Sequence, residues 1–324
     1  MYNSTELLQL VNDTIANLPL EKEPQGLYAP IRYVLSLGGK RIRPVLMLMA
    51  YNLYHEDVTP CLMPAVGLET YHNFTLLHDD LMDRAEVRRG KTCVHRKWND
   101  NTAILSGDNM LVLAFQYMMQ CDSEKLPDVM RIFSQTAIEI DEGQQYDVDF
   151  ETRDDVTEEE YIEMIRLKTS VLLACALRIG ATLGGATPQD ADALYRYGEK
   201  LGLAFQLQDD YLDVYGDPAV FGKKIGGDIL CNKKTFMLIN ALRNASCADH
   251  AELLQWINAD CPTPEEKIAA VTALYTKIGV DRMAQKRIDQ YFEQAKACLE
   301  EVSLPSDRKQ MLWSIAHKLM GRKS

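Results

Sequence analysis

The sequence predicts an all-α protein, a single large helical bundle that spans residues 1–324. Two long stretches without proline, Ala65–Leu126 and Asp128–Thr187, carry apolar residues at the spacing of one helix face. The alternation typical of strands is absent, as are the Asn-Gly and Asp-Gly pairs that mark hairpins, so we expect the whole chain to be helical. No low-complexity linker or shift in composition divides the chain, which favours one domain.

Helix starts can be placed from their capping residues. Thr157 precedes the run EEEYIEM, and Glu160 completes a capping box with it. Thr263 precedes Pro264, a residue favoured at the first helical position. The acidic segment Asp147–Glu160 is expected to be an exposed loop followed by the start of a helix.

Composition excludes several classes of protein. The net charge of −12 argues against a nucleic-acid partner, whose binders carry a basic face. Eight cysteines occur without any C-x-x-C pair, which argues against zinc or redox motifs and fits a reduced, cytoplasmic protein. The polar N-terminus does not resemble a signal peptide, and no apolar run is long enough for a transmembrane segment.

Two copies of the pattern Asp-Asp-x-x-Asp carry most of the chemical information. The first triad is Asp79, Asp80 and Asp83, and the second is Asp209, Asp210 and Asp213. Each lies at the end of a long apolar run that predicts a helix. The first and last aspartates of each triad are four residues apart and share a helix face, where like charges repel. Divalent cations would offset that repulsion, and carboxylates together with substrate phosphates are the usual surroundings of Mg²⁺. The fold is expected to bring the two triads together in a bundle.

Basic residues accompany the triads in four clusters. They are GGKRIRP with Lys40, Arg41 and Arg43; Arg88-Arg89-Gly90; Lys168-Thr169; and GKKIGGDILCNKKT with Lys223, Lys224, Lys233 and Lys234. Arginine binds phosphate through a bidentate fork and lysine through a point charge. Phosphate could thus be bound in two ways, through metal ions and directly by basic side chains. Two ways of binding suggest two phosphate groups.

The order GGKRIRP, HDDLMD, RRG, KTS, FQLQDDYLD and GKKIGGD resembles the trans-prenyltransferases. These are the polyprenyl synthetases, here of the short-chain farnesyl and geranylgeranyl diphosphate synthase type. The match spans residues 38–235, with Lys224 where the family often has proline and KTS in place of KTA. The resemblance implies the isoprenoid synthase fold with a central cavity, a homodimer, and isopentenyl diphosphate and an allylic diphosphate as substrates.

The resemblance also implies roles for individual residues. Three Mg²⁺ ions, replaceable by Mn²⁺, would be bound through Asp79, Asp83 and Asp209, with Asp80, Asp210 and Asp213 close by. The allylic diphosphate would contact Arg88, Lys168, Lys223 and Lys233. The metal-free isopentenyl diphosphate site would consist of Lys40, Arg43, His72 and Arg89. Thr169 and Gln206 would lie near the reacting carbons. Taken alone, His72 could equally be a core histidine and Lys168 a surface lysine.

The resemblance implies ionisation of the allylic diphosphate, condensation and elimination, with the released diphosphate as the base. Product length is expected to depend on the helix before Asp79, where Phe74 lies five residues back and Tyr71 eight. A C20 product, geranylgeranyl diphosphate, is favoured by the aromatic ring of Phe74, the small side chain of Thr75 and the lack of an insertion in the first aspartate motif. The alternative is a C15 product.

Three other functions are possible. A terpene cyclase shares the fold but usually has an Asn/Ser/Glu second metal motif, whereas this chain has DDYLD. An inactive regulatory subunit of a heteromeric prenyltransferase would usually have lost one triad. A calcium-binding module would need neither RRG nor Lys168.

Overall fold

The computed structural model describes residues 2–217, 225–258 and 263–321. Helices dominate it, as the sequence predicts, and the chain divides into two compact units. Unit 1 comprises Met1–Ser134, Cys175–Leu194 and Leu304–Leu312, and unit 2 comprises Gln135–Ala174, Tyr195–Ser303 and Trp313–Ser324. The single-domain organisation and the meeting of the two triads therefore stay predictions.

Unit 1 contains the first half of the helices and one small sheet. Its elements are α1 (Ser4–Ala16), α2 (Gln25–Ser36), α3 (Ile42–Asn52), α4 (Thr59–Met82), β1 (Val87–Arg88), β2 (Lys91–Thr92), α5 (Val94–Lys97) and α6 (Asp100–Met118). Parts of α7 (Leu126–Glu151), α9 (Val171–Leu183), α10 (Pro188–Tyr215) and α17 (Ser306–Met320) also belong to it.

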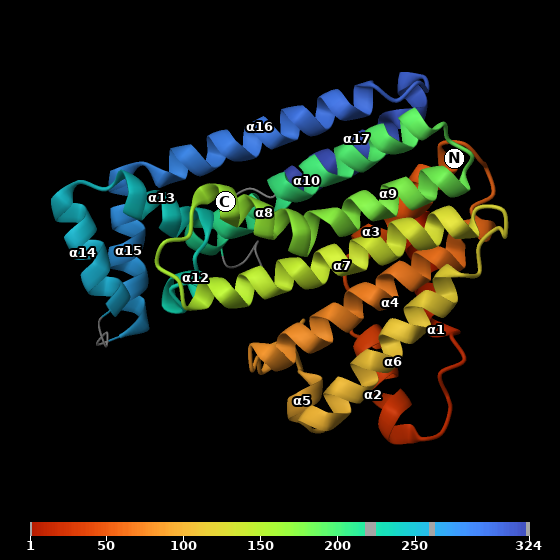
Figure 1. Ribbon diagram of the computed structural model, residues 1–324, viewed down its shortest axis with the longest axis horizontal. Helices are drawn as coiled ribbons and strands as arrows, with labels where there is room; N and C mark the ends of the chain where they lie inside the picture. The colour runs from red at the N-terminus through yellow and green to blue at the C-terminus, as the bar shows by residue number, and fades with distance from the viewer. Residues whose placement is uncertain (1, 218–224, 259–262, 322–324) are drawn as a thin grey trace. The chain divides into compact units, whose positions relative to one another are not determined.

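Helices α4 and α6 lie alongside each other in unit 1 (Figure 1). Two glycines permit this close approach. A side chain on Gly67 of α4 would come within 2.9 Å of the Ala114 carbonyl oxygen of α6, and one on Gly107 of α6 would come within 2.2 Å of the His78 ring. The contact at Gly67 is with backbone, so glycine there lets the two helices approach closely, while glycine at position 107 leaves room for the His78 ring.

The expectation that the whole chain is helical is wrong at residues 87–92. Strands β1 and β2 pair antiparallel, with Val87 opposite Thr92 and Arg88 opposite Lys91. The turn between them consists of Arg89 and Gly90, both at positive φ (53° and 73°). A two-residue hairpin turn favours positive φ at both positions. The pattern was missed because arginine replaces the usual Asn or Asp at the first of them.

Unit 2 contains the remaining helices. They are the rest of α7, α8 (Glu158–Ile165), a π-helix η1 (Arg166–Ser170), α12 (Gly227–Leu230), α13 (Phe236–Asn244), α14 (Cys247–Asn258), α15 (Pro264–Ile278) and α16 (Val280–Glu300), with most of α10. Helices α14 and α15 lie side by side (Figure 1). No helix among the described residues is long and apolar enough to cross a membrane.

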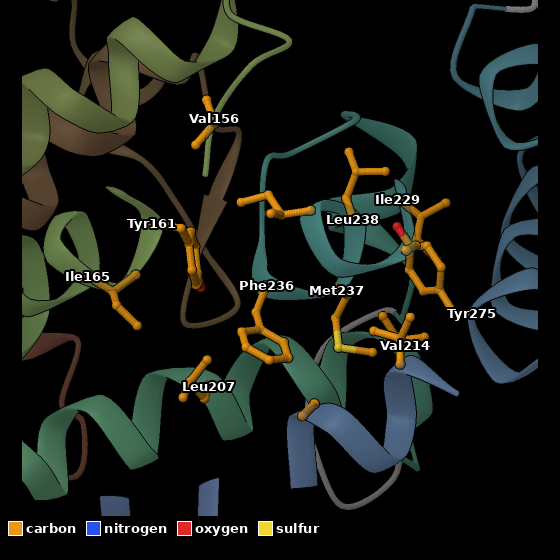
Figure 2. Packing of buried hydrophobic residues seen from close by; sticks show 14 of the residues in the cluster. Val156, Tyr161, Ile165, Leu207, Val214, Ile229, Phe236, Met237, Leu238 and Tyr275 are labelled. Atoms are coloured by element: carbon orange, nitrogen blue, oxygen red, sulfur yellow. The ribbon is translucent and has the colours of Figure 1, made fainter. Parts of the chain in front are cut away.

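The core of unit 2 packs around α13. Figure 2 shows Phe236 and Met237 pointing from α13 toward α10, where Leu207 and Val214 lie. Tyr161 of α8 belongs to the same cluster and is 1% exposed. This packing fixes α8 and α10 with respect to each other, and both carry polar residues of the candidate site.

Both predicted helix starts in unit 2 are confirmed. Thr157 accepts a hydrogen bond from the Glu160 amide, and the Glu160 carboxylate accepts one from the Thr157 amide. Thr263 caps α15 by accepting a hydrogen bond from the Glu266 amide, with Pro264 at the first position. The prediction for Asp147–Glu160 is only partly right, because α7 continues to Glu151 and so includes Asp147.

Candidate functional site

The first triad ends α4, as its sequence pattern predicts. Helix α4 stops at Met82, and Asp83 is the capping residue whose amide donates to the Asp79 carbonyl oxygen at 2.9 Å. Asp79 and Asp83 are one turn apart and so share a helix face. The Asp79 side chain is 18% exposed and Asp83 is exposed, which leaves carboxylate oxygens accessible at the helix end.

The middle aspartate of this triad has a different environment. Asp80 is 5% exposed, and its Oδ1 accepts from Arg88 Nε at 2.9 Å and from Arg88 Nη2 at 2.5 Å. Arg88 Nη2 also lies 3.5 Å from Asp79 Oδ2. Hairpin strand β1 supplies this arginine. Asp80 therefore holds Arg88 beside Asp79, where the guanidinium can meet an anion bound at the helix end.

The basic side chains of the GGKRIRP loop point in different directions, some into the core and some outward. Its chain reversal uses positive φ at Gly38 (72°) and Gly39 (131°), and Arg41 follows at 46°. Arg41 is turned into the core, where Nη1 donates to Glu69 Oε1 at 2.7 Å and both side chains are 2% exposed. Arg41 is thus a structural residue, although its motif groups it with the basic residues Lys40 and Arg43.

Removing Glu69 should destabilise the protein severely. A Glu69→Ala substitution leaves the Arg41 guanidinium buried without its carboxylate, which typically costs about 3–5 kcal/mol of the free energy of unfolding. Urea unfolding followed by circular dichroism measures this. The double substitution Arg41→Met with Glu69→Met serves as the control, because it removes both charges and should recover most of the loss. Equal midpoints for Glu69→Ala and the unsubstituted protein would contradict the importance of the pair.

Arg43 and His72 are in direct contact. Arg43 Nη1 and His72 Nε2 lie 3.1 Å apart. Burial, and then the nearby Arg43 and Arg89 guanidinium groups, lower the pKa of His72 well below its usual value, so the ring is neutral and Nε2 accepts the arginine's hydrogen bond. Burial lowers the pKa of Arg43 to about 10, which keeps it charged near neutrality. Its Nε is buried without a hydrogen-bond partner in the described structure, so this N–H can donate to an added anion.

Arg89 joins this cluster from the hairpin turn. Its Nη1 donates to the Gly38 carbonyl oxygen and approaches Asn73 Oδ1 at 3.4 Å. A side chain on Gly39 would lie 2.9 Å from the Arg89 guanidinium carbon, so glycine makes room for the arginine. Lys40, which follows in the loop, is exposed. Three of the four residues predicted for a metal-free anion site are therefore close together in unit 1, and the fourth lies on the loop beside them.

The second triad lies near the end of α10 in unit 2. Asp210 is 5% exposed; its Oδ2 accepts from the Tyr161 hydroxyl, and its Oδ1 accepts from Gln206 Nε2 at 3.1 Å. Burial and the neighbouring Asp228 raise the pKa of Asp210. Asp213 Oδ2 accepts from the Asp228 amide at 3.0 Å, which ties α10 to α12. In both triads the middle aspartate is thus buried against protein donors.

The pair Lys168-Thr169 lies in η1, a π-helical turn rather than the ordinary helix expected. Such single-turn bulges occur frequently at functional sites. Thr169 Oγ1 donates to Gln206 Oε1 at 3.3 Å. Lys168 Nζ donates to Asp147 Oδ2 at 2.6 Å, and Lys233 Nζ lies 3.8 Å from the same oxygen. Sequence reasoning missed Asp147, because no local pattern records a contact with a lysine 21 positions away in the chain.

Lys223 and Lys224, predicted in the same basic cluster as Lys233, lie outside the described residues.

An aromatic cluster lies on the helix before the first triad. Phe74 is 9% exposed and Tyr71 1%, and their ring centroids are 5.5 Å apart in an edge-to-face arrangement. Tyr71 also meets Phe133 of α7 at 5.3 Å, and Phe133 meets Phe115 of α6 at 4.9 Å. The predicted pair is therefore part of a larger cluster drawn from three helices. The Thr75 hydroxyl donates back to the His72 carbonyl oxygen at 2.9 Å.

The carboxylates suit a hard divalent cation. Within the described parts of the chain, no group of three or more His, Cys, Asp or Glu side chains could hold a metal ion by itself. Mg²⁺ needs no such group, since it keeps several waters and is bound by one or two carboxylates with substrate phosphates. The accessible oxygens of Asp79 and Asp83 fit that mode of binding.

Comparisons with known proteins agree on one family. Residues 24–275 match the family model described as polyprenyl synthetase. The chain is 39% identical to a geranylgeranyl diphosphate synthase of Methanosarcina mazei, over 94% of this chain and 92% of the relative. It is 37% identical to a geranylfarnesyl diphosphate synthase of Natronomonas pharaonis, over 88% and 87%. A crystal structure of geranylgeranyl pyrophosphate synthase matches with a TM-score of 0.94 and 43% identity, over 100% of both chains. The predicted all-α isoprenoid synthase fold is confirmed.

Proposed function

Because the chain belongs to the polyprenyl synthetase family, whose members are metal-dependent prenyltransferases that use isoprenyl diphosphates, we propose that its main product is geranylgeranyl diphosphate. The enzyme makes this product by adding isopentenyl diphosphate to an allylic diphosphate with five, ten or fifteen carbons. A relative with 39% identity and a solved structure with 43% identity are both named as geranylgeranyl diphosphate (pyrophosphate) synthases, which supports a C20 product. Phe74 with the small Thr75 supports the same length.

The reaction starts with departure of the allylic diphosphate. The bond between C1 and oxygen breaks, and its electron pair leaves with the diphosphate. In our proposal Arg88, Lys168, Lys223 and Lys233 bind and stabilise this anion. A bound divalent metal supplies Lewis-acid stabilisation of the same charge. We propose three Mg²⁺ ions, with Mn²⁺ as a substitute, and Asp79, Asp83 and Asp209 as sources of ligands.

The second half of the reaction concerns isopentenyl diphosphate. Lys40, Arg43, His72 and Arg89 hold its diphosphate without metal, and the buried Nε of Arg43 offers a donor for it. Thr169 and Gln206 lie near the reacting carbons. The double bond of isopentenyl diphosphate attacks the allylic cation and forms the new carbon–carbon bond. The released diphosphate then takes the proton that restores a double bond, so no protein base is required.

The observation that carries the proposal is that each triad has its own cationic partner set. Arg88 pairs with Asp79 and Asp80 within unit 1, and the positive charge of Lys233 acts on Asp210 within unit 2, where, against the effect of burial, it lowers the pKa of that carboxyl group. A terpene cyclase has no need for the metal-free anion set around Arg43, and an inactive subunit has no need for two complete triads.

Activity should be abolished by metal removal. The purified protein is incubated with isopentenyl diphosphate and each allylic primer, in Mg²⁺ or in excess EDTA, and the dephosphorylated products are separated by chromatography. We expect a C20 alcohol with Mg²⁺ or Mn²⁺ and none with EDTA, because the carboxylates alone repel the diphosphate. Cyclic products from geranylgeranyl diphosphate alone would indicate a cyclase instead, and turnover in EDTA would reject the metal-dependent mechanism.

The enzyme is proposed to be a cytoplasmic homodimer. Cytoplasmic location is supported by the scattered cysteines, which form no C-x-x-C pair in the sequence. Dimerisation is supported by α6, on which Leu105 and Val112 are 60% and 56% exposed and Met119, just after its end, is 46% exposed. These residues are seven apart and share one helix face. Light scattering should give twice the 36.8 kDa of one chain, and Val112→Glu should shift that mass toward one chain.

A further inference from the structure

Asp147 joins two lysines that come from different segments of unit 2. Its Oδ2 accepts a hydrogen bond from Lys168 Nζ of η1 at 2.6 Å. The same oxygen lies 3.8 Å from Lys233 Nζ, in the segment between α12 and α13. The Asp147 side chain is 18% exposed, against 24% for Lys168 and 46% for Lys233. The carboxylate is therefore the most enclosed member of the group.

Glycines bring the surrounding backbone into position. A side chain on Gly143, one turn before Asp147 on α7, would lie 2.4 Å from the Lys168 backbone nitrogen. On α10, a side chain on Gly202 would lie 2.7 Å from the Ser170 Cα. Both helices therefore pack directly on the backbone of η1. One turn beyond each glycine stands a polar side chain that contacts η1: Asp147 on α7 contacts Lys168, and Gln206 on α10 contacts Thr169.

Charge supports the same arrangement. Burial alone would raise the pKa of Asp147, but the Lys233 and Lys168 ammonium groups outweigh it and lower the pKa below its usual value. Asp147 is consequently a carboxylate at neutral pH. The group of two ammonium ions and one carboxylate has a net positive charge. The shared carboxylate holds the two ammonium groups near each other despite their mutual repulsion.

We propose that Asp147 is a positioning residue for the prenyl transfer, whose carboxylate holds Lys168 and Lys233 at the separation that the departing diphosphate requires. The inference rests on the proposed function of these lysines. Electrostatic stabilisation of a leaving group depends on donors that are already in place when charge develops. Asp147 acts through the lysines and does not itself meet the substrate, which would repel it.

This role predicts a specific kinetic signature. Asp147→Asn removes a negative charge beside the lysines, so attraction of the allylic diphosphate in the ground state does not weaken. The lysines lose their common anchor, so stabilisation of the departing diphosphate does weaken. Misplacement of a catalytic group by about 1 Å can cost on the order of 100-fold. We therefore expect kcat to fall about 10- to 100-fold while KM for the allylic diphosphate stays the same or decreases.

Four variants test the proposal in the full-length protein with Mg²⁺. Asp147→Asn is compared with Asp149→Asn, the same change on the same helix at an exposed residue that pairs with Gln145. Lys168→Gln should instead raise KM for the allylic diphosphate, because it removes a direct contact. Asp147→Glu keeps the charge but displaces it by one methylene, and should give an intermediate kcat at unchanged KM.

The outcomes separate the inference from the function on which it rests. Failure of the unsubstituted protein to make any polyprenyl diphosphate would reject the proposed function itself. With an active protein, the positioning role is overturned if Asp147→Asn keeps kcat within about twofold, or if it raises KM as Lys168→Gln does. Should Asp147→Asn fail to fold by circular dichroism, Asp147→Glu decides alone, and a kcat equal to that of Asp149→Asn would reject the proposal.

Discussion

Asp79→Ala and Asp209→Ala should each lower kcat by about 100- to 1000-fold, the loss typical when one group that stabilises a developing anion is removed. Each substitution removes a carboxylate proposed to supply a metal ligand, and the metal in turn offsets the charge of the leaving diphosphate. The folded structure should tolerate both changes, because neither residue is fully buried. Steady-state kinetics at saturating substrate and raised Mg²⁺ measure the loss.

Asp128→Ala is the matched control for the aspartate substitutions. Asp128 is an exposed aspartate in the first turn of α7 in unit 1, outside the candidate site. Its removal should leave kcat unchanged within about twofold, since a surface substitution of this kind affects stability little. Near-native rates in both Asp79→Ala and Asp209→Ala would mean that the triads are structural.

Phe74→Ala should lengthen the product by one or more isoprene units. The Phe74 ring lies roughly 7.5 Å down the helix from Asp79 at a rise of about 1.5 Å per residue, and its removal would open space for the growing chain. Tyr71→Ala in the same background should extend the product again, because Tyr71 lies one turn further from the triad. Chromatography of the dephosphorylated alcohols measures the chain length.

Loss of stability and change of product can be told apart. Truncating a buried aromatic typically costs about 3–5 kcal/mol, so Phe74→Ala will also lower the yield of folded enzyme. Phe150→Ala in unit 2 removes another buried ring, at 2% exposure against 9% for Phe74, and should lower stability without altering chain length. If folded Phe74→Ala protein releases only the product of the unsubstituted enzyme, the chain is limited elsewhere, and Phe133 and Phe115 become the residues to truncate.

Sequence reasoning was most successful for features that depend on neighbours within a few residues. The caps at Thr157 and Thr263 follow from contacts to residues three positions on, and both are confirmed. Placement of the first triad at a helix end is confirmed for the same reason. The hairpin at Arg89-Gly90 is also local, but its sequence signal is weak because arginine rarely adopts positive φ.

The chain by itself determined the family, the helical class, the capped helix starts and the two aspartate triads, because motif spacing and helical periodicity are properties of short segments. Only the tertiary structure decided which way each charged side chain turns. Arg41 pairs with Glu69 in the core while Arg43 meets His72, although the two arginines are two residues apart. Asp147 lies 21 positions from Lys168 in the chain, and only the packing of α7 on η1 through Gly143 places its carboxylate against that lysine. Contacts of this kind depend on long-range packing, which no local pattern records.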